Sequence, residues 1–264
     1  MNIREAKAST ALSPSKLPGL DWALNPYRGC QHGCVYCYSA DVMHMSAEDE
    51  WGTFVEVRRN IPVILAREKK KCSGTVGLGT VTDPYQPIEG KTMLTRYCLE
   101  QLAAGECRVC IQTKSDLVTR DIDILRTMKG AEVGITVSTM NPEIAAMLEP
   151  GAPEPAKRMA ALAMLSGAGI STWVFLGPII PGMNDSSESM EAVIKAAKQA
   201  GCSKVIYDKL RLKPILRERM KKRFGYSRTK DMFRLAGERD WEERVFIDIE
   251  VLCDDAGIKS EKAF

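Results

Sequence analysis

Residues 132 to 180 contain one complete copy of the pattern that decides the fold. EVGITVS (132–138) and STWVFLGPII (171–180) are apolar runs of strand length, and PAKRMAALAMLSGAG (155–169) between them has helical spacing. Helices commonly end at glycine, and this one ends at the last glycine of that segment. A strand, a helix and a second strand in this order predict a βαβ unit with two parallel strands.

The same alternation extends in both directions along the chain. It predicts a six-stranded parallel α/β fold in one domain, with a core over about 20–212 and a basic helical extension over about 213–264. An amphipathic helix over 241–257 should pack on the outside of the sheet. The other expected strands are 22–28, 74–81, 108–113 and 203–210, and the other expected helices are 60–71, 93–105, 119–130 and 185–201.

Composition narrows the class of protein. The chain has 264 residues, a net charge of +3 and no stretch that approaches eighteen uninterrupted apolar residues. We therefore expect a cytoplasmic protein without a membrane span. Its nine cysteines are an odd number in a chain too long to need disulfides, so we interpret them as reduced thiols or metal ligands.

Polar side chains follow the predicted strands at the points where the strands end. Thr82 and Asp83 come after the second strand, Lys114 after the third, and Ser138 ends the fourth. The carboxyl ends of parallel strands meet at one edge of a sheet, which is where such folds place their functional sites. These side chains should therefore share one site.

Potential metal ligands are most concentrated in RGCQHGCVYCYS (28–39), after the start of the first predicted strand. This stretch contains Cys30, His32, Cys34 and Cys37. A disulfide would leave one cysteine unpaired. Zinc could take the three thiolates and the imidazole, although structural zinc usually draws its ligands from two separated pairs. An iron-sulfur cubane held by three thiolates would keep one iron open for reaction.

In its Cys-x3-Cys-x2-Cys spacing, with Tyr36 before the last cysteine, the loop resembles the radical S-adenosylmethionine superfamily. The resemblance implies a partial (β/α)6 barrel in which Cys30, Cys34 and Cys37 hold one [4Fe-4S] cluster. In that superfamily S-adenosylmethionine chelates the open iron and is cleaved to a 5′-deoxyadenosyl radical that abstracts hydrogen from a substrate. An electron donor such as ferredoxin or flavodoxin is then implied.

Four stretches between about residues 25 and 180 resemble the spore photoproduct lyase-like branch: GCQHGCVYCYS, TVTDPYQPIE, QTKSDL and ITVST. In the lyases, tyrosines beside the last cysteine, a Ser-Asp pair, a lysine and a serine surround the cofactor. The carboxylate and the ammonium can each make a charge-assisted hydrogen bond to the cofactor. The matching cofactor-binding positions here are Tyr36, Tyr38, Thr82, Asp83, Lys114 and Ser138.

The catalytic positions depart from the lyase pattern. In the lyases a cysteine two positions before the Ser-Asp pair returns a hydrogen atom to the product radical, and Thr80 stands at that position here. A hydroxyl O–H bond is much stronger than a thiol S–H bond, so Thr80 should donate hydrogen poorly. Tyr38 remains as a second candidate, and we expect little DNA photoproduct lyase activity.

A basic run over 217–230 carries more positive charge than the whole chain's net charge. It is interpreted either as a solvated helix face or as a contact for a nucleic-acid or phosphate-bearing substrate, with Phe224 and Tyr226 interleaved. Two other classes also stay open, a zinc-bearing nucleic-acid binding module and an iron-sulfur electron-transfer protein. The cations are Arg217, Arg219, Lys221, Lys222, Arg223, Arg228 and Lys230.

Cys107 and Cys110 form a Cys-x2-Cys pair that could be redox-active or hold a second cluster. If 108–113 is a strand, alternation places the two on opposite faces, which disfavours shared ligation. We expect both to be small packed residues, together with Cys72, Cys98, Cys202 and Cys253.

Overall fold

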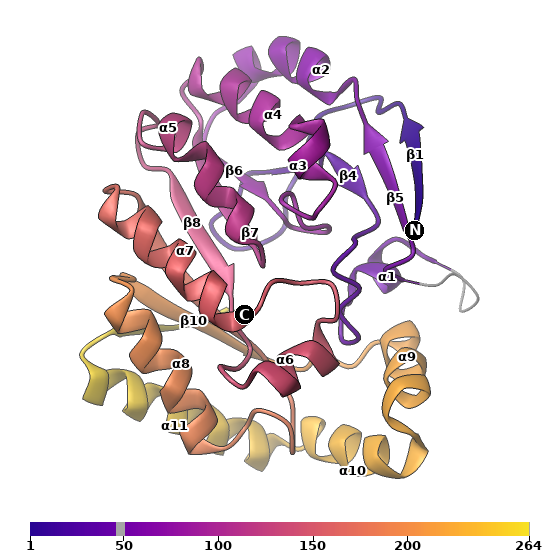
Figure 1. Ribbon diagram of the computed structural model, residues 1–264, viewed down its shortest axis with the longest axis vertical. Coiled ribbons are helices and arrows are strands. Elements are labelled where there is room, and N and C mark those ends of the chain that lie inside the picture. Colours follow the sequence, from indigo (N-terminus) through magenta and orange to yellow (C-terminus); the bar gives the residue numbers. More distant parts are fainter. Residues whose placement is uncertain (46–50, 264) are drawn as a thin grey trace.

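The computed structural model describes residues 1–45 and 51–263 and is built on a sheet of eight strands in the order β11-β10-β9-β8-β7-β6-β3-β2 (Figure 1). Neighbouring strands are parallel except β2 and β3. The six strands from β3 to β10 lie side by side in chain order, which confirms the predicted partial barrel. The bounds are β2 Leu12–Pro14, β3 Trp22–Leu24, β6 Thr75–Leu78, β7 Arg108–Thr113, β8 Glu132–Thr136, β9 Ser171–Ile179, β10 Lys204–Lys209 and β11 Lys259–Lys262.

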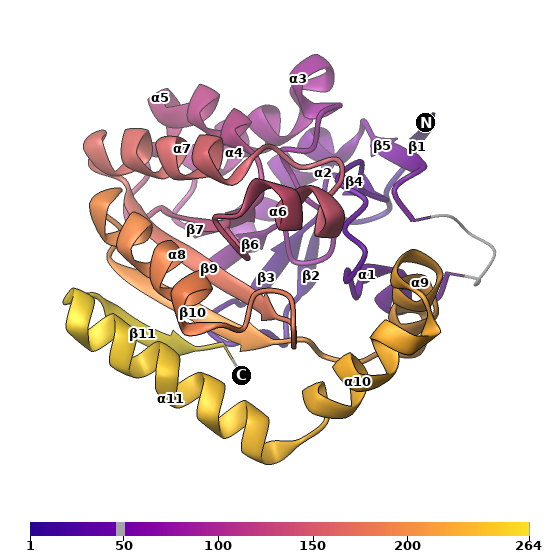
Figure 2. The same cartoon turned by 60° about the horizontal axis from the view of Figure 1, so that its bottom comes forward.

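Helices follow one another in an arc around the outside of this sheet (Figures 1 and 2). The amphipathic C-terminal helix, α11, which the sequence places on the outside of the sheet, packs beside α8 and β11. In the part of the chain that the structure describes, no helix combines the length and the apolar character needed to cross a membrane. The arc consists of α2 Ile61–Glu68, α4 Leu94–Ala103, α5 Ile122–Leu125, α7 Pro155–Gly167, α8 Ser187–Gln199 and α11 Arg239–Ala256.

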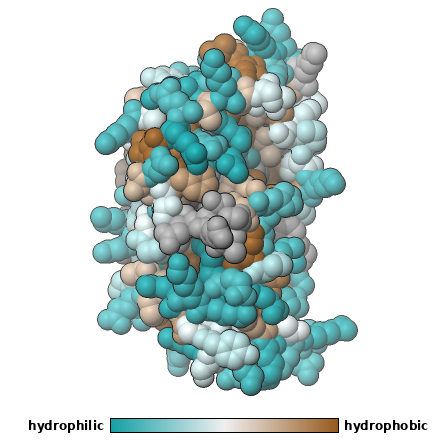
Figure 3. Space-filling model, turned by 90° about the vertical axis from the view of Figure 1, so that its right-hand side faces the viewer, coloured by the Kyte–Doolittle hydropathy of each residue, from teal (hydrophilic) through white to brown (hydrophobic). Residues whose placement is uncertain are grey.

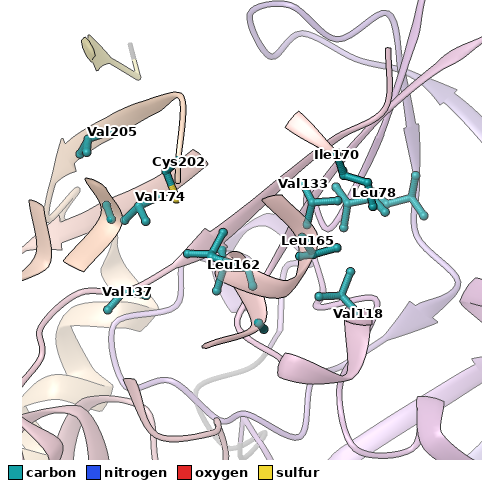
Figure 4. Close-up of a cluster of buried hydrophobic side chains, with 14 of the residues drawn as sticks. Leu78, Val118, Val133, Val137, Leu162, Leu165, Ile170, Val174, Cys202 and Val205 are labelled. Atoms are coloured by element: carbon teal, nitrogen blue, oxygen red, sulfur yellow. The ribbon is translucent and has the colours of Figure 1, made fainter. Parts of the chain in front are cut away.

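The main core lies between the sheet and these helices. Figure 4 shows Leu162 and Leu165 of α7 beside strand residues such as Val133 and Val174. All four side chains are fully buried. Burying an aliphatic side chain of this size stabilises the fold by about 1.5–3 kcal/mol, so this face fixes the sheet that carries the site.

The first predicted strand, 22–28, is wrong in part because the chain leaves the main sheet within it. β3 ends at Leu24, and β4 Tyr27–Arg28 pairs with β5 Phe54–Arg58 in a second sheet. Pro26 lies in the gap, where it lacks the N–H that a ladder requires. The Asn25 side chain accepts a hydrogen bond from Val81 N at 3.1 Å, which holds the bend against the end of β6.

Several short elements carry no clear signal in the sequence. The N-terminal arm forms β1 Asn2–Ala6, which pairs with β5. The helix expected over 119–130 is a 3-10 turn, Asp116–Asp121, followed by the single turn of α5. Single-turn or short helices depend on tertiary packing because a few residues cannot offset the cost of helix nucleation. The others are α1 Ser39–Val42, α3 Glu89–Thr92 and α6 Pro142–Leu148.

The basic run forms two helices, α9 Pro214–Phe224 and α10 Tyr226–Ala236. Gly225 separates them with φ +83°, a backbone conformation that suits glycine. Figure 2 shows α9 beside α1, away from the arc of outer helices. The extension therefore lies next to the cysteine loop.

The cysteine prediction is corrected at one pair. Cys72 and Cys107 form a disulfide with their Cα atoms 6.2 Å apart. Thr75 lies opposite Arg108 in the β6–β7 register, so the segments just before these strands are brought together, which spacing alone could not reveal. Cys110 is a free, half-buried thiol, whereas Cys98, Cys202 and Cys253 are free and buried as expected.

Candidate functional site

The cysteine loop lies between β4 and α1, and its three thiols are all free. Cys30 and Cys34 are buried, and Cys37 is half-buried. Burial raises the pKa of the Cys34 thiol to about 12, and burial together with Asp83, Cys34 and Cys37 raises the pKa of Cys30. Burial thus disfavours the thiolates, and each thiol would have to lose its proton to bind a metal that supplies the compensating positive charge.

The described side chains, as placed, do not form a site for a single metal ion. Within residues 1–45 and 51–263, no three His, Cys, Asp or Glu side chains meet where one ion could bind them all. His32 pairs with Asp83, with Nδ1 lying 3.2 Å from Asp83 Oδ2. A cubane engages each thiolate through a different iron, so its ligands surround a volume instead of converging on a point. The three thiols of the loop are the number of protein ligands that a cubane with one open iron would take.

Residues 148–151, at the end of α6 and in the loop after it, are hydrogen-bonded to the cysteine loop. Val35 N donates to Leu148 O at 2.9 Å, and Gly151 N donates to His32 O at 2.9 Å. A Cβ on Gly151 would lie 2.2 Å from the carbonyl oxygen of Gln31, so the two backbones can approach this closely only at a glycine. These backbone contacts fix the loop that carries the thiols.

Glu149, within this segment, is the centre of a buried polar network. Its carboxylate accepts hydrogen bonds from the Tyr36 hydroxyl and, at 3.3 Å, from Ser138 Oγ, and it forms an ion pair with Arg158. Burial would raise the pKa of Glu149, but Arg158 and Lys114 outweigh burial and lower it. The carboxylate is therefore charged and orients Tyr36 and Ser138.

Lys114 faces the same network. Its Nζ lies 5.6 Å from the centre of the Tyr36 ring. Burial would lower the pKa of this ammonium, but Cys34 and Glu149 raise it. Lys114 is therefore a charged, half-buried cation near a thiol and a carboxylate, where it could hold an anionic group of a ligand.

Asp83 and Thr82 have partners within the chain. Asp83 accepts hydrogen bonds from Thr113 Oγ1 and from the backbone N–H of Lys114, both at 2.7 Å. Burial would raise the pKa of Asp83, but His32 and these bonds lower it to about 2. Thr82 Oγ1 donates to Tyr27 O at 2.8 Å. Both residues join the ends of neighbouring segments, so as placed they support the site.

The two catalytic candidates are neighbours. The Tyr38 hydroxyl donates to the Thr80 carbonyl oxygen at 2.7 Å, and the Tyr38 side chain is exposed. Asn25 Nδ2 donates to Thr80 Oγ1 at 3.0 Å. The structure thus brings the predicted residues from four strand ends together around the cysteine loop.

The sequence gives weak signals for three further residues at this site. Glu149 stands in LEPG, which reads as a turn, and Arg158 lies on a helix where a charge is ordinarily solvated. Arg219 is hidden in the basic run. Their roles depend on contacts between segments far apart in the chain.

A partial barrel with three free thiols after its first strand defines a class of protein that could house an iron-sulfur cluster with one open iron. The family model described as Radical SAM superfamily matches residues 24–197. The chain belongs to the radical S-adenosylmethionine superfamily, whose members use a [4Fe-4S] cluster and S-adenosylmethionine, and it is a radical S-adenosylmethionine enzyme.

The chain is also similar to individual relatives and to solved structures. An uncharacterised protein of Methanocaldococcus jannaschii is 35% identical over 185 residues, 70% of each chain. A radical SAM Nalpha-GlyT isomerase of Pseudomonas phage M6 is 25% identical over 212 residues, 78% of this chain and 43% of that one. A spore photoproduct lyase variant is similar in fold, with a TM-score of 0.77 at 16% identity over 99% of this chain and 82% of the lyase.

Proposed function

We propose that Cys30, Cys34 and Cys37 hold one [4Fe-4S] cluster and that S-adenosylmethionine binds beside it, against Tyr36 and Lys114. The observation that carries this proposal is the juxtaposition of three free thiols with the charged pair Lys114 and Glu149 at one edge of a parallel sheet. Bound and reduced, the cluster supplies the electron that cleaves S-adenosylmethionine to a radical able to abstract hydrogen.

The side chains have separable tasks in this proposal. Lys114 pairs with the carboxylate of S-adenosylmethionine, and Ser138 offers a hydroxyl held by Glu149. Tyr36 is 7% exposed, and its ring covers the network and excludes water. Asp83 and Thr82 position the strand ends. To contact the cofactor, each side chain would have to give up the hydrogen bonds that it makes within the chain. Tyr38 and Thr80 face the reacting substrate.

We also propose that the substrate is a nucleic acid or a phosphate-bearing nucleotide. Figure 3 shows hydrophilic side chains gathered where α9 and α10 lie, and Arg223, Arg228 and Lys230 are exposed there. Phosphate recognition needs concentrated cations of this kind. A phage relative is named for an Nalpha-GlyT isomerase, and one solved structural neighbour is a spore photoproduct lyase complexed with dinucleoside spore photoproduct.

The test is anaerobic reconstitution with iron and sulfide, followed by reduction in the presence of S-adenosylmethionine and deuterated DNA, RNA or nucleotides. We expect 5′-deoxyadenosine that carries deuterium from one of these substrates. Zinc in place of iron would contradict the cluster, and a cluster inert to S-adenosylmethionine would indicate an electron-transfer protein.

DNA with the spore photoproduct should be repaired poorly because Thr80 lacks a thiol, and efficient repair would make the protein a photoproduct lyase.

Replacing Lys114 with alanine should weaken binding of S-adenosylmethionine while the iron content stays unchanged. The variant loses one charge-assisted hydrogen bond, worth about 1.5–3 kcal/mol, or roughly ten- to a hundredfold in affinity. Anaerobic equilibrium dialysis measures this, with the exposed Lys157→Ala as the control. Equal affinity in both variants would remove Lys114 from the cofactor site.

Neutralising Lys221, Lys222 and Arg223 together should weaken nucleic-acid binding and flatten its dependence on salt. Each lost phosphate contact reduces the slope of log K against log salt by about 0.9 for duplex DNA. Fluorescence anisotropy over a salt series measures the slope. A control triple variant at the exposed Lys129, Lys157 and Lys195 should bind like the native protein, and absence of salt-dependent binding by the native protein would reject this surface.

A further inference from the structure

The C-terminal extension packs directly on the cysteine loop. Leu216 and Met220 of α9 and Phe233 of α10 lie in one hydrophobic cluster with Cys34 and Tyr36. This cluster is separate from the main core between the sheet and the outer helices. The extension therefore covers the thiols of the cysteine loop, although more than 170 residues separate the loop from α9 in the sequence.

Arg219 is the polar contact at the centre of this packing. Its Nη1 donates to the carbonyl oxygen of Cys37 at 3.0 Å, and its Nη2 donates to the carbonyl oxygen of Cys34. The guanidinium also lies 5.7 Å from the centre of the Trp51 ring. A planar guanidinium can span two acceptors in a fixed geometry, which an ammonium cannot do equally well.

A second contact fixes α9 at its first turn. The Asp41 carboxylate, four residues after Cys37, accepts hydrogen bonds from Ile215 N at 2.9 Å and Leu216 N at 3.1 Å. A carboxylate is favourable at this position because the first N–H groups of a helix have no partner within it. Asp41 and Arg219 thus tie the extension to both sides of the last thiol.

We infer that Arg219 is a positioning residue for the cluster, which fixes the backbone at Cys34 and Cys37 and places a positive charge beside the bound cluster. This inference rests on the proposed function. A cubane held by three thiolates gains one negative charge on reduction, so a neighbouring cation stabilises the reduced form more than the oxidised form. Arg219 therefore raises the reduction potential of the cluster.

The experiment compares R219Q, R219K and the control R223Q, which removes the same charge from an exposed position on the same helix. Each protein is reconstituted anaerobically, its iron and sulfide are counted, and its cluster is titrated potentiometrically by electron paramagnetic resonance. In R219Q the reduced-to-oxidised ratio at a fixed potential should fall about tenfold, a shift of about 59 mV to more negative values.

R219K should keep a potential near that of the native protein because it keeps the positive charge. It should retain less iron because an ammonium cannot hold both carbonyl oxygens, of Cys34 and Cys37, as the guanidinium does. R223Q should match the native protein in both measurements. If R219Q does not fold, D41N loosens the same helix. It should lower iron retention, and because it removes an anion instead of a cation it should not move the potential to more negative values.

Two results would overturn the inference in distinguishable ways. Native potential and native iron content in R219Q would reject the role of Arg219 and leave the proposed function intact. Failure of the native protein to take up iron and sulfide would reject the proposed function and this inference together.

Discussion

Single replacement of Cys30, Cys34 or Cys37 with alanine is expected to abolish the iron-sulfur chromophore of anaerobically reconstituted protein. Each thiol is one of only three available ligands, so loss of any one leaves two irons of a cubane without a protein ligand. Three measurements report the loss: iron and sulfide content, the visible absorbance of the cluster, and reductive cleavage of S-adenosylmethionine. All three should fall to background.

The matched controls are Cys110→Ala and Cys202→Ala, which remove free thiols outside the cysteine loop. Both should retain native iron content. Cys107→Ala breaks the disulfide with Cys72 and should also keep its iron, because neither sulfur lies in the loop. If Cys107→Ala lost half its iron while cleavage of S-adenosylmethionine persisted, a second cluster would be present.

Replacing Arg158 with methionine is expected to lower the free energy of unfolding of the apoprotein by about 3–5 kcal/mol, because it leaves the buried Glu149 carboxylate without its ion-pair partner. Arg158 is 1% exposed and Glu149 is fully buried. Arg158 also donates to the carbonyl oxygens of Pro153 and Thr136, at 2.7 and 3.0 Å, and these bonds are lost with it. Chemical denaturation at pH 7 measures the effect.

The loss should shrink as the pH falls through the ordinary range of a carboxyl group. Burial on its own would raise the pKa of Glu149. In the native protein the positive charge of Arg158 is the largest opposing effect, and the pKa is lowered overall. Without Arg158 the folded-state pKa rises above its unfolded value, and protonation then relieves the unpaired charge at low pH. The native contribution is present above the unfolded pKa and is lost as pH falls, so the two proteins converge.

The control is Arg239→Met, which breaks an exposed ion pair with Glu243 on α11. Exposed pairs of this kind contribute at most about 1 kcal/mol, so this variant should unfold close to the native protein. Equal stability of the Arg158 and Arg239 variants at pH 7 would show that the Glu149 network is not a structural centre of the site.

Much of the architecture is readable from local pattern. The strands β7 and β9 fall within one residue of their predicted bounds, and α7 within two, because each buries a regular apolar face that leaves its period in the sequence. The fragments that were missed, such as β5 and α6, are too short to show a period. Their stability comes from neighbours in space.

The same division holds for the site. The sequence by itself determined the three thiols, the strand-end residues Lys114 and Ser138, and hence the superfamily, because local spacing and strand ends are properties of consecutive residues. Only the tertiary structure decided that Glu149, Arg158 and Arg219 surround these residues, that Asp83 is occupied by its neighbours, and that Cys72 pairs with Cys107. Most of those contacts join segments far apart in the chain, and the energies of all of them depend on burial, which no local pattern encodes.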